Sequence, residues 1–134
     1  MSEEKLQSDI ARRFSELYPD KRGQLFHVSN ERNNKIQAYR ARAIGIVNGV
    51  ADFIFFEHFY FIATELKVPG TRHERHHIIS QVEWGKIWES QGGIWRLCRT
   101  VDEALSCYKM KPKGLTIEEV EKMLFETTTK TIKF

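Results

Sequence analysis

Two carboxylates and an ammonium group, on Asp52, Glu65 and Lys67, bracket the most apolar stretch of the chain. The intervening residues predict two β-strands joined by a turn at positions 57 and 58, so that residue numbers across the pair sum to about 115. In that register Asp52 lies diagonally from Glu65 on one face, roughly 7–8 Å away, which is close enough for both carboxylates to hold one metal ion. Lys67 points to the same face because strand side chains alternate.

The surroundings of these charges favour a function for them. The residues between Asp52 and Glu65 are apolar on both faces, which predicts a sheet covered on both sides. A charge at the edge of such a sheet costs desolvation energy unless it is paired or binds a cation. The alternative is that Glu65 and Lys67 are solvated residues at a strand end. The glycine three residues before Asp52, together with the hairpin offset to Glu65, favours the functional interpretation.

Length and composition limit the class of protein. A chain of 134 residues predicts one domain with a substantial core, and 41% hydrophobic residues predict a globular protein with no apolar run long enough to span a bilayer. The polar start, MSEEKLQSD, carries no secretory signal, and Cys98 and Cys107 are expected to be buried free thiols. We therefore expect a cytoplasmic location, in the host cytoplasm if the source is viral. The net charge of +3 is compatible with nucleic acid.

Apolar periodicity and capping signals predict the elements that position these charges. The expected elements are a helix at 3–17, a strand at 25–29, a short helix at 36–43, the two hairpin strands, a helix from the Ser80–Glu83 capping box to Gly92-Gly93, a strand at 93–99, helices at 100–108 and 116–126, and a short strand or loose tail at 127–134. The core order α-β-β-β-α-β-α predicts an α/β fold with a central mixed β-sheet flanked by helices. Residues 1–110 are expected to form the main domain, with 111–134 packed on it.

The segment TRHERHHII, residues 71–79, contains three histidines. His73, His76 and His77, with Glu74 among them, invite a zinc site, although their spacing does not match a two-histidine helix motif and no cysteine pair accompanies them. We expect a mobile basic loop beside the hairpin site. A zinc-stabilised structural protein that uses the three histidines remains an alternative.

Six segments in order resemble a known enzyme family. The segments are SEEKLQ, HVSNE, GIVNGVADFIFF, FIATELKVPG, SQVEW and GGIWRLCRTVDEA, spread over roughly residues 3–108. Together they resemble the PD-(D/E)XK nuclease superfamily, and within it the small VRR-NUC nucleases of phages and mobile elements. The resemblance implies a restriction-endonuclease-like core and a metal-dependent DNA endonuclease, with branched, flapped or junction DNA as the structure-specific substrates of relatives. Ala51 departs from the family, which usually has proline before the aspartate, and the 71–79 loop is longer and richer in histidine.

The resemblance also implies roles at the hairpin. Asp52 and Glu65 would bind Mg²⁺ or Mn²⁺, assisted by the backbone carbonyl of Leu66. Lys67 would orient or help to deprotonate the attacking water and would stabilise charge that builds on the phosphate.

Residues outside the hairpin receive roles from the same resemblance. Glu3 would act on the metal or its waters from the first helix, with Glu4 as the alternative because the register is open. Fraying of the first turn is the structural interpretation of Glu3. Gln81, expected in the first turn of the helix that begins at Ser80, would be the motif glutamine, and an ordinary exposed residue is the alternative. Asn30 matches a recurrent loop asparagine.

The expected partner is DNA, with no membrane. A single short domain offers little surface for gripping a DNA junction, which leaves a homodimer open beside a monomer. The alternative function is a catalytically inactive module that keeps the nuclease fold to bind DNA or protein.

Overall fold

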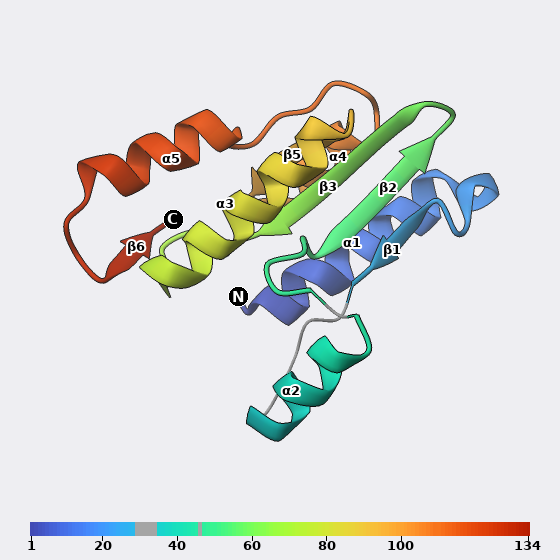
Figure 1. The fold of residues 1–134 in the computed structure, drawn as a ribbon. Helices are drawn as coiled ribbons and strands as arrows, with labels where there is room; N and C mark the ends of the chain where they lie inside the picture. The colour runs from blue at the N-terminus through green and yellow to red at the C-terminus, as the bar shows by residue number, and fades with distance from the viewer. Residues whose placement is uncertain (29–34, 46) are drawn as a thin grey trace.

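The computed structural model describes residues 1–28, 35–45 and 47–134, and it is an α/β fold with helices on both faces of a mixed four-stranded sheet (Figure 1). Its helices are α1 (Glu3–Leu17), the 3₁₀ turn η1 (Pro19–Lys21), α2 (Lys35–Ala43), α3 (Arg75–Ser90), α4 (Val101–Cys107) and α5 (Ile117–Glu126). Its strands are β1 (Leu25–His27), β2 (Phe53–Glu57), β3 (Tyr60–Leu66), β4 (Arg72–Glu74), β5 (Ile94–Cys98) and β6 (Thr131–Lys133). The mixed sheet flanked by helices is confirmed.

The main sheet has the strand order β1-β2-β3-β5, and β4 pairs with β6 in a separate two-stranded sheet. The pairs β1–β2 and β2–β3 are antiparallel, whereas β3 and β5 are parallel, as the intervening α3 crossover predicts. Strand β1 covers residues 25–27 of the expected 25–29 strand, and residue 29 lies outside the described residues. The short helix expected at 36–43 is present as α2, which stands apart from the sheet (Figure 1).

The register of the β2–β3 hairpin differs from the predicted one by two. Glu57 pairs with Tyr60 and Phe53 pairs with Thr64, so the turn consists of His58 and Phe59. His58 has φ 53°, the positive φ that two-residue hairpin turns require at their first position. The polar pair at 57 and 58 suggested the wrong turn because neither glycine nor asparagine marks the true one. The correction sets Asp52 directly opposite Glu65, one residue beyond the last pair, instead of on the diagonal.

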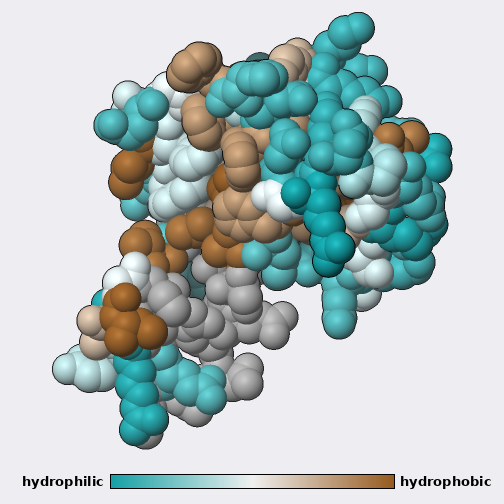
Figure 2. Space-filling view, turned by 90° about the vertical axis from the view of Figure 1, so that its right-hand side faces the viewer, coloured by the Kyte–Doolittle hydropathy of each residue, from teal (hydrophilic) through white to brown (hydrophobic). Residues whose placement is uncertain are grey.

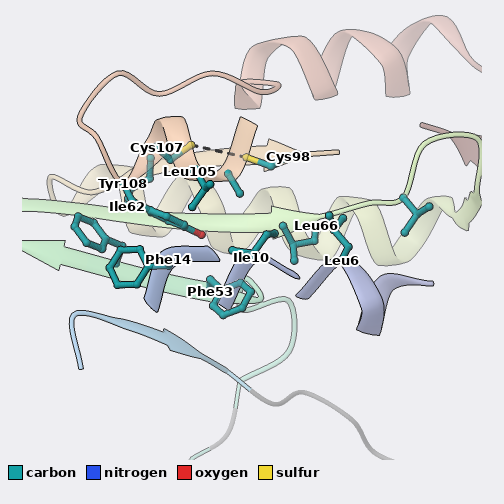
Figure 3. Close-up of a cluster of buried hydrophobic side chains, with 13 residues drawn as sticks. Leu6, Ile10, Phe14, Phe53, Ile62, Leu66, Cys98, Leu105, Cys107 and Tyr108 are labelled. Carbon is teal, nitrogen blue, oxygen red and sulfur yellow. Dashed lines mark hydrogen bonds between the residues drawn. The ribbon is translucent and has the colours of Figure 1, made fainter. Parts of the chain in front are cut away.

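Two apolar cores lie on opposite faces of the sheet. On one face α1 supplies Leu6, Ile10 and Phe14, which pack with Phe55 of β2 and Tyr108 after α4 (Figure 3). Their i, i+4 spacing is the stripe that predicted the first helix. The thiols of Cys98 and Cys107 belong to this core and are free and buried, as predicted.

The other face packs against α3 and α5. Trp95 of β5 is fully buried there with Val82 of α3 and Val120 of α5. Gly85 makes the close approach of α3 feasible, because a Cβ at this position would lie 2.9 Å from the Trp95 ring. The C-terminal segment consists of α5, which packs against α3, and β6, which pairs with β4.

The end of the hairpin is not covered. Phe59 in the turn is 97% exposed, and Phe56 and Phe61 beside it are 39% and 41% exposed. The prediction that the sheet is covered on both faces is therefore wrong here, because the face that carries the paired Phe56 and Phe61 is left exposed at this end. Figure 2 views the molecule from this side and shows apolar patches on an otherwise mostly hydrophilic surface.

Helix α3 begins at Arg75 instead of Ser80, and residues 72–74 form β4, so the predicted mobile loop and capping box at 80–83 are both wrong. The reason is tertiary. The Arg75 backbone N–H donates to the Lys130 carbonyl at 2.8 Å, and its guanidinium donates to the carbonyls of Thr127 and Leu124. The C-terminal segment thus orders a stretch whose local sequence suggested a loop.

The predicted starts of α4 and α5 are correct. Thr100 caps α4 by accepting from the Glu103 N–H, and Thr116 with Glu119 forms a full capping box at α5. In the part of the chain that the structure describes, no helix is long and apolar enough to cross a bilayer.

Candidate metal centre

Asp52 is fixed through both its carboxylate and its backbone. Its Oδ2 accepts from the Leu66 N–H at 2.8 Å, across the open end of the β2–β3 pair. Its backbone carbonyl accepts from the Val28 N–H at 2.8 Å and from Nδ1 of His27 at 2.8 Å. These bonds couple Asp52 to both neighbouring strands.

The turn before Asp52 packs against α3. Gly49 has φ 82°, and a Cβ there would lie 2.5 Å from the Ser80 carbonyl oxygen. Only glycine combines this backbone conformation with so close an approach. The glycine that the sequence places three residues before Asp52 therefore has a structural role in aiming the carboxylate.

Glu65 is a buried carboxylate with one unused oxygen. The residue is 1% exposed, and its Oε1 accepts from Lys67 Nζ at 3.2 Å. Its Oε2 is buried and has no hydrogen-bond partner among the residues that the structure describes. Such an atom loses hydration without compensation, which costs about 1–3 kcal/mol or more for a charged group. This unused oxygen needs a proton or a cation.

Glu3 completes a cluster of three carboxylates. One oxygen each from Glu3, Asp52 and Glu65 lies within 4.8 Å of the other two. Glu3 occupies the first turn of α1, where Ser2 caps the helix by accepting from the Lys5 N–H, and it is half-buried. Glu4 is exposed, so Glu3 is the acid that faces the centre, and it is also a first-turn acid of α1.

The protonation of the cluster reflects its excess of negative charge. Burial, then the neighbouring Asp52 charge, raises the pKa of Glu65 well above its usual value, and the Lys67 ammonium opposes this. Burial, then Asp52, likewise raises the pKa of Glu3. One ammonium does not balance three carboxylates, so the centre favours added positive charge.

The donor set fits a hard divalent cation. Carboxylate oxygens are the ligands that Mg²⁺ and Mn²⁺ prefer, and the unused Oε2 of Glu65 supplies one without breaking an existing bond. Asp52 and Glu65 lie together as the hairpin predicted, with Lys67, which is 4% exposed, ion-paired beside them. The Leu66 side chain is fully buried; participation of its backbone carbonyl stays a prediction.

Gln81 is in the second turn of α3 instead of the first, because the helix starts five residues earlier than predicted. It lines a surface pocket with Asn48, Gly49, His76, His77 and Ser80. Its Oε1 is buried without a hydrogen-bond partner in the described parts of the chain. Gln81 is therefore not an ordinary exposed residue, although it is not one of the three clustered acids. Asn30 lies outside the described residues.

Sequence reasoning missed His27. Because a carbonyl oxygen can only accept, the His27 ring donates from Nδ1 to Asp52, and Nε2 is left to accept or to bind a ligand. The ring packs edge-on against Phe53, with centroids 5.5 Å apart. The alternation of residues 25–29 predicted a strand that includes His27, but only the β1–β2 register brings His27 to the acids.

Comparison of the chain with protein-family models, with curated proteins and with solved structures gives no match.

Proposed function

We propose that this protein is a divalent-metal-dependent nuclease that hydrolyses phosphodiester bonds in DNA, with a restriction-endonuclease-like core of the VRR-NUC type. The observation that carries the proposal is the buried Glu65 carboxylate, which has one unused oxygen and which brings an oxygen within 4.8 Å of oxygens of Asp52 and Glu3. A fold keeps three acids this close at a cost in stability. A site that binds a cation for catalysis would account for this loss of stability.

Asp52 and Glu65 would hold Mg²⁺ or Mn²⁺, with Glu3 acting on the ion or its waters. When bound, such an ion neutralises phosphate oxygens and lowers the pKa of a coordinated water. The hydrogen bond from the Leu66 N–H would keep the Asp52 carboxylate in place while it held the ion. Glu65 is shielded from bulk water, which strengthens every electrostatic interaction at the centre.

Lys67 would stabilise the negative charge that develops on the phosphate and orient the attacking water. Its backbone N–H donates to the Cys98 carbonyl at 3.1 Å, which ties the end of β3 to β5. Its ammonium is held by Glu65 Oε1 at 3.2 Å, in a buried environment where the charge is poorly screened. The lysine is thus preorganised next to the acids.

The electrostatics of the whole chain are compatible with DNA as the substrate. The net charge is +3, and α2 exposes Arg40 and Arg42. Contacts from such side chains to phosphates supply affinity without reading sequence. Branched, flapped or junction DNA is the substrate class that the family resemblance adds.

The experiment is a cleavage panel. Wild type, Asp52→Ala and Lys67→Ala are incubated at low salt with labelled duplex, single-stranded, flapped and four-way DNA, each with Mg²⁺, Mn²⁺ or EDTA. We expect cleavage by wild type alone, abolished by EDTA. Intact DNA in every lane would refute the nuclease, and equal DNA affinity of wild type and Asp52→Ala would then favour a binding module.

A further inference from the structure

We infer that Glu74, His76 and His77 form a second metal site, which takes a zinc-class divalent cation and is separate from the carboxylate centre. One ligand atom from each of the three residues lies within 4.8 Å of the other two. The Oε2 of Glu74 and the Nε2 of His76 are 3.3 Å apart. The site does not depend on the proposed nuclease activity.

The separations suit tetrahedral coordination. Bonds of about 2.0–2.1 Å to zinc place neighbouring ligand atoms roughly 3.3 Å from each other, which is the observed Glu74–His76 separation. The rings of His76 and His77 have centroids 4.1 Å apart and planes inclined by 55°. Small side-chain rotations therefore bring all three donors to one ion, and a fourth position remains for water or another ligand.

The backbone that carries these ligands is fixed. Glu74 is the last residue of β4, where it pairs with Thr131 of β6, and it is the N-cap residue of α3. Arg75, between the ligands, is held by its backbone and guanidinium bonds to the C-terminal segment. The Glu74 and His76 side chains are exposed, so they bind an ion without first losing a buried partner. A rigid backbone lowers the entropy cost of coordination, because only the side chains have to be ordered.

The donor types separate the two sites chemically. Two imidazoles and one carboxylate are a ligand set for zinc, as in three-ligand sites with an open fourth position. The three acids of the Glu65 centre offer carboxylate oxygens, which favour Mg²⁺ or Mn²⁺. Zinc and magnesium are therefore expected to occupy different places in the same chain.

His73 is not part of the site, contrary to the three-histidine zinc hypothesis. The Thr71 hydroxyl donates its proton to the Val68 carbonyl at 2.6 Å, so it must accept from His73 Nε2, 2.8 Å away. The His73 ring also packs near Phe134, with centroids 6.0 Å apart. His73 thus provides a matched control, a histidine of the same segment that is already engaged.

The site borders the pocket that Gln81 lines, because His76 and His77 form part of the same wall. A cation held there would add positive charge at the pocket rim. Its open coordination position would be available to an anionic oxygen.

The test is zinc titration of the full chain by calorimetry, after removal of metal with EDTA and dialysis. Wild type, His73→Ala and Glu65→Gln are expected to bind one zinc ion each, whereas His76→Ala and His77→Ala each bind at least about tenfold more weakly. Co²⁺ in place of zinc should give the visible absorption of a tetrahedral ion in wild type and lose it in His77→Ala.

Each contrary outcome overturns the inference. Zinc binding that survives in His76→Ala and His77→Ala but disappears in Glu65→Gln assigns the ion to the carboxylate centre. Absence of zinc binding by wild type refutes the site outright. Failure of the nuclease panel leaves the zinc result unaffected, so the two proposals fail separately.

Discussion

Replacing Glu65 by glutamine should stabilise the metal-free protein. The three carboxylates lie within 4.8 Å of one another. With that limit as the separation and an effective dielectric constant of about 20, each neighbouring unit charge repels the Glu65 charge by about 3.5 kcal/mol, and Glu3 and Asp52 together repel it by about 7 kcal/mol. The attraction between Glu65 and the Lys67 ammonium, 3.2 Å away, offsets about 5 kcal/mol of this repulsion at the same dielectric constant. The difference predicts that Glu65→Gln raises the free energy of unfolding by about 2 kcal/mol.

Thermal denaturation in EDTA at pH 8 measures this effect. With an unfolding entropy of about 2.1 cal/mol/K per residue over 134 residues, 2 kcal/mol corresponds to a rise in Tm of about 7 °C. Glu57→Gln is the control, because Glu57 lies in the same hairpin and forms a simple pair with Lys21 at 3.0 Å. That substitution should cost about 0–1 kcal/mol. A fall in Tm for Glu65→Gln comparable to that of the control would refute the reasoning.

Divalent cations should narrow the difference in Tm between the two proteins. For a dissociation constant of about 1 mM, 10 mM Mg²⁺ stabilises wild type by about 1.4 kcal/mol, or about 5 °C in Tm. Glu65→Gln should show little of this increase because it lacks the charged ligand. An equal increase in both proteins would place the cation elsewhere.

Three further outcomes follow from the structure. Because the pKa of Glu65 is raised in the folded protein, the contribution of Glu65 to the stability of the metal-free protein is fully present below about pH 4.5, the usual value, and is lost as pH rises through the folded pKa. The Mg²⁺-induced rise in Tm should therefore be larger at pH 8 than at pH 5. Equal rises at the two pH values would contradict this. Gly49→Ala should cost about 1–3 kcal/mol, measured by urea denaturation, because of its φ of 82° and the Ser80 carbonyl; an unchanged midpoint would argue against the tight turn. Tyr108→Phe should cost about 1–3 kcal/mol by stranding the buried Thr64 hydroxyl, 2.8 Å from the Tyr108 oxygen, with no loss of cleavage activity; a large loss of activity would mean that Tyr108 acts at the site.

Elements with local signals could be predicted from the sequence. The stripe of Leu6, Ile10 and Phe14 defined α1, and the Thr116–Glu119 box marked the start of α5, because these patterns depend on residues within one or two turns. The parallel β3–β5 pair followed from the crossover geometry.

Elements that depend on distant partners could not be predicted in this way. Strand β4 and the first turn of α3 are ordered by β6 and by the bonds of Arg75 to residues about 50 positions away. The predicted hairpin register was wrong by two because His58 adopts a positive φ, which a histidine does not indicate in the sequence.

The candidate site shows the same division. The spacing of Asp52, Glu65 and Lys67 was sufficient to bring them together in either register, since a shift of two keeps every side chain on its face. The position of His27 and the choice of Glu3 over Glu4 required the packing of β1 and α1 on the sheet.

The most direct test of the account compares DNA cleavage by wild type and Glu65→Gln, purified identically, in Mn²⁺ at pH 8. The account predicts that wild type cleaves, that EDTA stops it, and that Glu65→Gln remains folded with a Tm in EDTA above that of wild type yet leaves the DNA intact. Cleavage at the same rate by both proteins would contradict the assignment of Glu65, and absence of cleavage by wild type would contradict the proposed function.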